Sequence, residues 1–449
     1  MAALDGISPG HSPFMSRMPS SRSEQQSTQE KEQETQLAEI ANELTYCVNG
    51  ECAKEDFDPI PSSALANETF PGGLNPNDIP IVPKLADPPS AEQRKASVEE
   101  EPKESVKRET KGPVIRRIVK ALPDGVDSSN RFFSDSEWNQ RVEMVQNLMK
   151  KEGTDVIVIT SPANIFWLSG FHTTGYYFFQ CMVVPAYEEP FAMVRQMEGT
   201  GVQARTCLDH CYVFQDTEDP IETLVELLKK KVQTKNVVGY EEDSYFFPAK
   251  QQRQFTRALS DINFVDCSGL VEKCRRAKSP AEIEVMKLAG KATEAAMEAG
   301  LNSIAVGRTE NNVAAEVYKA AFDAGGEYPA CPSFIASGPR GYIGHATWEG
   351  RQLKEGDTVF LEIGGCKYRY HTAMMRTAYI GWEIPPKMKE MEKIFDRCLT
   401  ECMKAMKPGV PIKDIDAMSK KIISNNSYGI ETKNRFGYSL GVAFSPGWG

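Results

Sequence analysis

Residues 337–381 have the sequence SGPRGYIGHATWEGRQLKEGDTVFLEIGGCKYRYHTAMMRTAYIG, in which charged side chains interrupt apolar runs. The segment begins as a loop rich in glycine and proline that carries His345. Glu355–Asp357 (EGD) follows this loop and predicts a tight hairpin connection. The apolar run Thr358–Ile363 then predicts a buried strand, with Glu362 at its end.

A second segment, Tyr368–Ile380, carries His371 and Arg376. A carboxylate at the end of a buried strand must be paired or hydrogen-bonded, because burying a lone charge is costly. One interpretation is structural: Glu362 forms an ion pair with Arg376, and His345 is a loop histidine whose hydrogen bonds are satisfied. The other interpretation is a reaction centre, since perturbed charges gather at functional sites.

The spacing of these residues favours the reaction centre. His345 precedes Glu362 by seventeen residues, and Arg376 follows it by fourteen. This arrangement resembles the signature of the pita-bread superfamily, which contains creatinase, the Xaa-Pro peptidases and methionine aminopeptidase. In that signature a histidine precedes a strand with the motif Asp-x-Gly, and a second aspartate lies just before the arginine of Thr-Arg-Thr. The resemblance extends from about Phe132 to the last residue.

The departures from the family pattern concern the metal ligands. Glu362 and Ala373 stand where the metallopeptidases have two metal-binding aspartates, and Tyr438 of Gly437–Gly441 stands where they have a histidine. A site for two metal ions needs several oxygen donors and an imidazole, whereas alanine donates nothing and a neutral phenol is a poor ligand. Together with Arg369–His371, these residues resemble the metal-free branch of creatinase and the ectoine hydrolases, which implies that no metal cofactor is used.

Hydrolysis of a C–N bond without a metal requires a base or nucleophile, a proton shuttle and charge stabilisation. We assign His345 as the proton shuttle and Glu362 as the general base or, alternatively, a carboxylate nucleophile. Arg376 is expected to orient Glu362 or the carboxylate of the substrate. Tyr438 and His371 are candidate hydrogen-bond donors to the substrate, although His371 is equally compatible with packing beneath the sheet.

Composition limits the classes of function. The chain has 449 residues, of which 41% are hydrophobic, and this length suits two folded domains. A net charge of -10 argues against a nucleic-acid partner, and the sequence contains neither a membrane-spanning run nor a signal peptide. The eleven cysteines are scattered without a C-x-x-C pair, which favours reduced thiols. We therefore expect a cytoplasmic protein with a small-molecule substrate.

The chain divides into three parts by pattern. Residues 1–112 are rich in Ser, Gln, Glu, Lys and Pro, a composition that predicts a disordered extension. Residues 113–275 alternate helical patterns with short apolar strands and predict an α/β domain that resembles the N-terminal domain of the creatinase family. Residues 276–449 resemble the pita-bread catalytic domain.

In the creatinase family the N-terminal domain helps to close the active site, often that of the partner subunit in a dimer. The resemblance therefore implies a homodimer, and it makes His172, Tyr176 and Tyr177 candidate substrate contacts. A packed aromatic hairpin is the structural alternative for the surrounding segment.

Four helices are predicted in the catalytic part. Ser279–Glu282 (SPAE) has the sequence of an N-cap with a capping box, and the helix it begins should end near Ala299. The other three helices are predicted over 311–324, 386–406 and 412–425. Their order suggests the two related halves of the pita-bread fold.

The sequence ends at Gly449, before the resemblance would supply the closing strands of the second half and two late glutamates. We expect either a fragment or truncated gene model, which is favoured, or a catalytically crippled protein.

Three functions remain open: a metal-independent C–N hydrolase, a Xaa-Pro-type metallopeptidase with substitute ligands such as Glu362 and His371, and a non-enzymatic binding protein. A lyase for sulfonium osmolytes is a related outlier.

Overall fold

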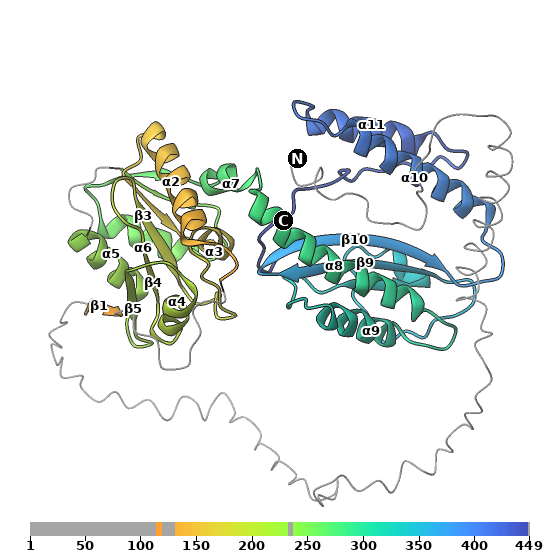
Figure 1. Ribbon diagram of the computed structural model, residues 1–449, viewed down its shortest axis with the longest axis horizontal. Helices are drawn as coiled ribbons and strands as arrows, with labels where there is room; N and C mark the ends of the chain where they lie inside the picture. The colour runs from red at the N-terminus through yellow and green to blue at the C-terminus, as the bar shows by residue number, and fades with distance from the viewer. Residues whose placement is uncertain (1–113, 119–130, 232–236, 448–449) are drawn as a thin grey trace, which may run out of the picture. The chain divides into compact units, whose positions relative to one another are not determined.

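The computed structural model describes residues 114–118, 131–231 and 237–447 (Figure 1). The predicted disordered extension, residues 1–112, lies outside the described residues. Within the described part, a seven-stranded sheet with its helices precedes a three-stranded sheet with its own helices. These two units are the predicted α/β N-terminal domain and the pita-bread-type catalytic domain.

The N-terminal sheet is mixed, with the strand order β1-β5-β4-β3-β2-β6-β7. Its strands are β1 (Arg116–Ile118), β2 (Val156–Ile159), β3 (Cys181–Pro185), β4 (Phe191–Arg195), β5 (Cys211–Phe214), β6 (Val237–Tyr240) and β7 (Asn263–Asp266). The sequence predicts apolar strands over 155–160, 182–184, 191–194 and 237–240, which correspond to β2, β3, β4 and β6. The strands β1, β5 and β7 were not predicted.

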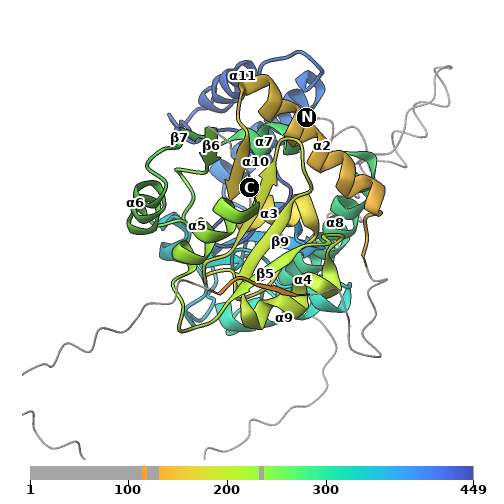
Figure 2. The same ribbon diagram turned by 90° about the vertical axis from the view of Figure 1, so that its left-hand side faces the viewer.

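Both faces of this sheet are covered, as the continuous apolar sequence of β2 predicts. Val156 and Val158 pack with α5 and α6 on one face, whereas Ile157 and Ile159 pack with α2 and α3 on the other (Figure 2). The helices of this domain are α2 (Asp135–Glu152), α3 (Pro162–Ser169), α4 (Gly199–Arg205), α5 (Pro220–Lys231), α6 (Ala249–Ala258) and α7 (Leu270–Arg275).

The aromatic segment that follows β2 is helical at its start. Residues 162–169 form α3, with Pro162 in its first turn and Gly170 as a left-handed C-cap at φ 80°. His172, Tyr176 and Tyr177, for which a packed aromatic hairpin is the structural alternative, lie after this helix. Proline suits the first helical turn because its missing N–H has no partner there, and a left-handed cap favours glycine.

The catalytic domain begins with the predicted helix, α8 (Pro280–Asn302). Both hydrogen bonds of the capping box between Ser279 and Glu282 are present. The second helix, α9 (Glu310–Asp323), is capped by Thr309. The three-stranded sheet is antiparallel in the order β10-β9-β8, with β8 (Phe334–Ser337), β9 (Thr358–Lys367) and β10 (Tyr370–Tyr379).

Helix α8 lies along β9 and β10 (Figure 1). Gly365 of β9 makes this close approach possible, since a Cβ atom there would lie 2.5 Å from the carbonyl oxygen of Ala289. The residues of β9 that face the helix are Val359, Leu361 and Ile363, which are fully buried. The opposite face of this strand carries Thr358, Phe360 and Glu362.

The tight hairpin of this domain lies elsewhere than the sequence predicts. Strands β9 and β10 are joined at Tyr368 and Arg369, which have φ angles of 44° and 60°. Glu355–Asp357 instead forms a turn that leads into β9. The sequence did not reveal the hairpin because two-residue hairpin turns with positive φ angles favour Asn and Gly rather than Tyr and Arg.

Two further helices follow the sheet. They are α10 (Pro386–Ala405) and α11 (Ile412–Ser424), close to the predicted ranges. They pack on each other through Ile394, Cys398, Cys402, Ile415 and Ile423. These residues recur at helical spacing in both segments, which is why their sequences predicted amphipathic helices.

Candidate active site

Glu362 lies in the middle of β9 and is partly buried. Its side chain is on the face of the hairpin opposite to α8, because alternate residues of a strand point to opposite faces and Leu361 and Ile363 face the helix. Across the strands, Glu362 pairs with Phe334 of β8 and Met375 of β10. The side chain therefore lies between two apolar strand neighbours.

The structure brings His345 to this carboxylate, as the sequence predicts. His345 has a left-handed φ of 59°, and its ring lies 5.2 Å from the ring of Phe334, the strand partner of Glu362. Burial raises the pKa of the Glu362 carboxyl above its ordinary value, and the positive charge of His345 partly offsets the rise. The two groups are therefore electrostatic neighbours.

Arg376 does not join them. It pairs with Leu361, whose side chain faces α8, so Arg376 and Glu362 point to opposite faces of the hairpin. The guanidinium is exposed and donates to the carbonyl oxygen of Met375 at 2.8 Å. The expected ion pair with Glu362, and the expected orienting role for this arginine, are not supported by this geometry.

His371 is fully buried, and its two ring nitrogens are engaged by the backbone. Nε2 accepts a hydrogen bond from the N–H of Ala330 at 2.9 Å, so Nδ1 carries the proton and donates to the carbonyl oxygen of Arg369 at 3.0 Å. Burial, reinforced by the charge of Arg369, lowers the pKa of His371 to about 3. This placement fits the interpretation of His371 as a packed residue, and its role as a hydrogen-bond donor to the substrate stays a prediction.

Arg369 completes the support of the same region. Its buried guanidinium donates to the carbonyl oxygens of Tyr328 at 2.7 Å and Ala443 at 3.1 Å, and it stacks on the rings of Tyr328 and Phe444. Together with His371, it fixes the segment that precedes β8 and the segment after α11 to the tip of the hairpin.

Cys331 is a residue of this region that the sequence analysis missed. Its thiol donates to the carbonyl oxygen of Pro446 at 3.1 Å. Burial, followed by the negative charge of Glu362, raises the pKa of the Cys331 thiol. The thiol is therefore close to the carboxylate and held in its neutral form. No spacing rule links a cysteine before β8 to a carboxylate in β9, so the sequence offered no signal.

Three tyrosines are also predicted to contact the substrate, and each lies against different side chains. Tyr438 is 41% exposed and has Arg435 5.2 Å from its ring centre. Tyr176 packs edge-on against Phe246 and Phe444. Tyr177 is 71% exposed and lies against Phe178.

His172 is held as a neutral ring. Its Nε2 accepts from Arg205, and Nδ1 lies 3.3 Å from the carbonyl oxygen of Gly170. Burial and the charge of Arg205 lower the pKa of His172 to about 4. No contact recorded for His172 involves Glu362 or His345, so the predicted substrate-contacting role stays a prediction.

The donor set beside Glu362 does not fit a pair of divalent metal ions. Ala373 pairs with Gly364, on the face that carries Glu362, and neither residue has a side-chain oxygen. Across residues 114–118, 131–231 and 237–447, no group of three or more His, Cys, Asp or Glu side chains could hold a metal ion. Divalent ions of this kind require several oxygen or nitrogen donors at one point.

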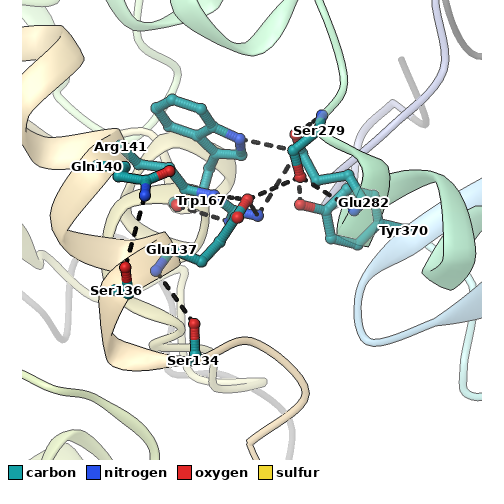
Figure 3. Close-up of polar contacts among 9 residues, drawn as sticks. All are labelled: Ser134, Ser136, Glu137, Gln140, Arg141, Trp167, Ser279, Glu282 and Tyr370. Carbon is teal, nitrogen blue, oxygen red and sulfur yellow. Dashed lines mark hydrogen bonds and ion pairs between the residues drawn. The ribbon is translucent and has the colours of Figure 1, made fainter.

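A buried polar junction ties the hairpin to the N-terminal domain (Figure 3). The carboxylate of Glu282, in the first turn of α8, accepts hydrogen bonds from Trp167 Nε1 at 2.9 Å and Tyr370 Oη at 2.7 Å. Arg141 lies 4.0 Å from the same carboxylate and also pairs with Glu137 at 3.0 Å. Helices α2, α3 and α8 and strand β10 therefore meet at one carboxylate.

In the part of the chain that the structure describes, no helix is both long and apolar enough to cross a membrane. Nine cysteines in that part form no disulfide bond with one another.

Two family models match the chain. The model of the creatinase/prolidase N-terminal domain matches residues 141–277, and that of metallopeptidase family M24 matches residues 284–447. The ectoine hydrolase of Halomonas elongata is 31% identical over 338 residues, which cover 71% of this chain and 84% of that protein. An uncharacterized hydrolase/peptidase of Sinorhizobium fredii is 29% identical and covers 71% and 83%.

Solved structures share the fold. The prolidase from Pyrococcus horikoshii and the Xaa-Pro dipeptidase from Bacillus anthracis each match with a TM-score of 0.57 and 22% identity, covering 65% of this chain and 79% of theirs. At this identity the likeness concerns the fold alone. Together with the sequence relatives, these findings show that the chain is an enzyme of the M24 hydrolase family, with a creatinase/prolidase-type N-terminal domain.

Proposed function

We propose that this enzyme hydrolyses a C–N bond of the amide or amidine type in a small zwitterionic compound without a metal ion, with Glu362 and His345 as its reacting residues. The observation that carries the proposal is Glu362 itself. It is a partly buried carboxylate that makes no hydrogen bond or ion pair with another described residue, and it stands next to an imidazole. A purely structural carboxylate at such a position would be paired.

The raised pKa of Glu362 suits a group that gives and takes protons. As a general base, Glu362 removes a proton from a water molecule, whose oxygen attacks the carbon of the C–N bond. As a nucleophile, a carboxylate oxygen attacks that carbon and forms an acyl-enzyme, which water then hydrolyses. On either route the C–N bond breaks and the leaving nitrogen takes a proton from His345.

The metal-independent part of the proposal is supported by the donor set. Ala373 and Gly364 lie near Glu362 on its face of the hairpin and offer no side-chain donor for an ion. The similarity to an ectoine hydrolase favours a small cyclic amidine as substrate class. The second candidate, a Xaa-Pro-type peptidase, is favoured by the fold shared with prolidases, but it requires substitute ligands and His371 has both nitrogens engaged.

Arg376 is left out of this reaction centre because of the face on which it lies. Tyr438, Tyr177, His172 and Tyr176 remain proposed substrate contacts, although His172 and Tyr176 also contact protein groups. A homodimer is part of the proposal, and sedimentation equilibrium of the purified protein tests it.

The proposal is tested by assaying the purified enzyme on ectoine, creatine and a Xaa-Pro dipeptide, with and without a strong chelator. Hydrolysis of a small solute at a rate that the chelator leaves unchanged is the expected result. Peptide cleavage that stops with the chelator and returns with added metal would establish the metallopeptidase instead. Reversible binding of a solute with no turnover would contradict the proposed hydrolysis.

A further inference from the structure

One buried carboxylate holds both ends of the loop that carries His345. Glu310 is the first residue of α9 and has no solvent exposure. Its Oε1 accepts from the backbone N–H and the hydroxyl of Ser337, at 2.8 and 2.7 Å, where β8 ends and the loop begins. Its Oε2 accepts from the N–H of Glu349 at 3.0 Å, at the far end of the loop, and from the guanidinium of Arg340.

Arg340 extends this clamp across the loop. Besides Glu310, its guanidinium donates to the carbonyl oxygen of Thr347 at 2.7 Å and pairs with the Glu349 carboxylate at 3.0 Å. Position 345 therefore lies between two points, Arg340 and Thr347, that one guanidinium connects. The start of the loop is further braced by Arg351, which donates to the hydroxyl of Ser337 at 2.8 Å.

A charged group without solvent exposure is costly unless its hydrogen-bonding capacity is filled. Four donors and the N-terminus of α9 stabilise the negative charge of Glu310. His345, by contrast, is exposed, makes no hydrogen bond with another described residue and touches the ring of Phe334. The position of the His345 imidazole therefore depends more on how the two ends of its loop are held than on contacts that the imidazole itself makes.

We propose that Glu310 is a positioning residue that holds the His345 imidazole over Phe334 and beside Glu362. Glu310 lies on the α9 side of β8 and acts only through the loop. The proposal rests on the proposed role of His345 in proton transfer. It predicts that weakening the clamp displaces the imidazole while the substrate-binding surface is preserved.

The test compares Glu310→Gln with Glu316→Gln, a matched change at an exposed glutamate of the same helix that pairs with Arg308. The glutamine retains an oxygen for Ser337 but turns its amide donors toward Arg340 and Glu349. We expect kcat of Glu310→Gln to fall by about 10- to 100-fold with a small change in KM, because misplacing a reacting group by about 1 Å has an effect of this order. Glu316→Gln should match the wild type.

A second readout does not depend on turnover. The chain has five histidines, so selective labelling of the imidazoles gives a simple NMR spectrum in which His345→Gln assigns one signal. The ring of Phe334, 5.2 Å away, shifts that signal through its ring current. The Phe334→Leu variant lacks this ring, so its His345 signal marks the position without a ring-current shift. Glu310→Gln should move the His345 signal toward that position.

If Glu310→Gln does not fold, Arg340→Lys serves in its place, since it leaves the other three donors to Glu310 intact.

An unchanged His345 signal in a folded Glu310→Gln or Arg340→Lys variant would overturn the proposal, whatever happens to turnover. A shifted signal together with a lower kcat supports it. A shifted signal with wild-type turnover also supports the positioning role, but it would show that His345 does not transfer the proton, and the proposed mechanism would then fail on its own.

Discussion

Tyr370 donates its hydroxyl hydrogen to Glu282 at 2.7 Å, so the first residue of β10 is bound to the first turn of α8. The same carboxylate accepts from Trp167 of the N-terminal domain. The capping box of α8 is thus also the point at which the hairpin bearing Glu362 is fixed to the rest of the described protein. Glu282 therefore both caps the start of α8 and binds Trp167 of α3 and Tyr370 of β10.

The junction should contribute strongly to stability. Glu282→Ala leaves the buried donors of Trp167 and Tyr370 without an acceptor, and each such loss costs about 1–3 kcal/mol. We expect the free energy of unfolding to fall by about 3 kcal/mol or more, measured by urea denaturation. Glu284→Ala, at an exposed position of the same helix, should change it by less than about 0.5 kcal/mol. Equal stability of the two variants would contradict this account of the junction.

Replacement of the proposed base should lower turnover strongly without preventing folding. Glu362→Gln is expected to lower kcat by about 100-fold or more, the range associated with general base catalysis. Its melting temperature at pH 7 should equal or exceed that of the wild type, since a carboxyl with a raised pKa destabilises the folded state once it is ionised. The sign follows from the direction of the shift: stability is lost as the pH rises through the pKa of Glu362 in the folded state.

The neighbouring imidazole should be visible in the titration of Glu362. Burial raises the pKa of this carboxyl and the charge of His345 lowers it, so His345→Gln should raise the pKa further. Carbon-13 NMR of glutamate side chains measures this, with Glu362→Gln identifying the signal. A Glu362 pKa that does not respond to His345→Gln would show that the two groups are not neighbours in solution.

His371 should matter for acid stability more than for catalysis. The pKa of His371 is about 3 in the folded protein, below the ordinary value of 6.5. Below pH 6.5 the unfolded chain therefore takes up a proton that the folded protein does not, and this uptake favours unfolding. The stabilising contribution is complete above pH 6.5 and declines as the pH falls toward 3. His371→Gln should flatten this decline in a series of urea denaturations between pH 7 and pH 4. An unchanged slope would mean that His371 is not buried as a neutral ring.

Much of the local structure could be predicted from the sequence alone. The start of α8 follows from Ser279, Pro280 and Glu282, and α10 and α11 follow from apolar residues at helical spacing. The proximity of His345 and Glu362 was predicted from their spacing and from the resemblance to the pita-bread family. Helix caps and helical periodicity are interactions between residues a few positions apart, which is why a sequence displays them.

The positions of other side chains depend on contacts between segments that are far apart in the sequence. Arg376 was expected beside Glu362, but the register of β9 and β10 puts the two on opposite faces, since a shift of one residue reverses the side to which a strand residue points. That register is set by the turn at Tyr368 and Arg369, which has no recognisable turn sequence. The domain boundary near Arg275 and the homodimer remain predictions.

The sequence by itself therefore indicated the four helices of the catalytic part and the central strands, whereas the catalytic pairing of Glu362 with His345 stays a prediction. Only the tertiary structure decided that His371 is buried, that the Cys331 thiol lies near Glu362 and that Glu310 clamps the His345 loop. The physical reason is that burial and hydrogen-bond partners depend on which distant segments meet. A single buried carboxylate between two loop ends satisfies its four donors only after the chain has folded.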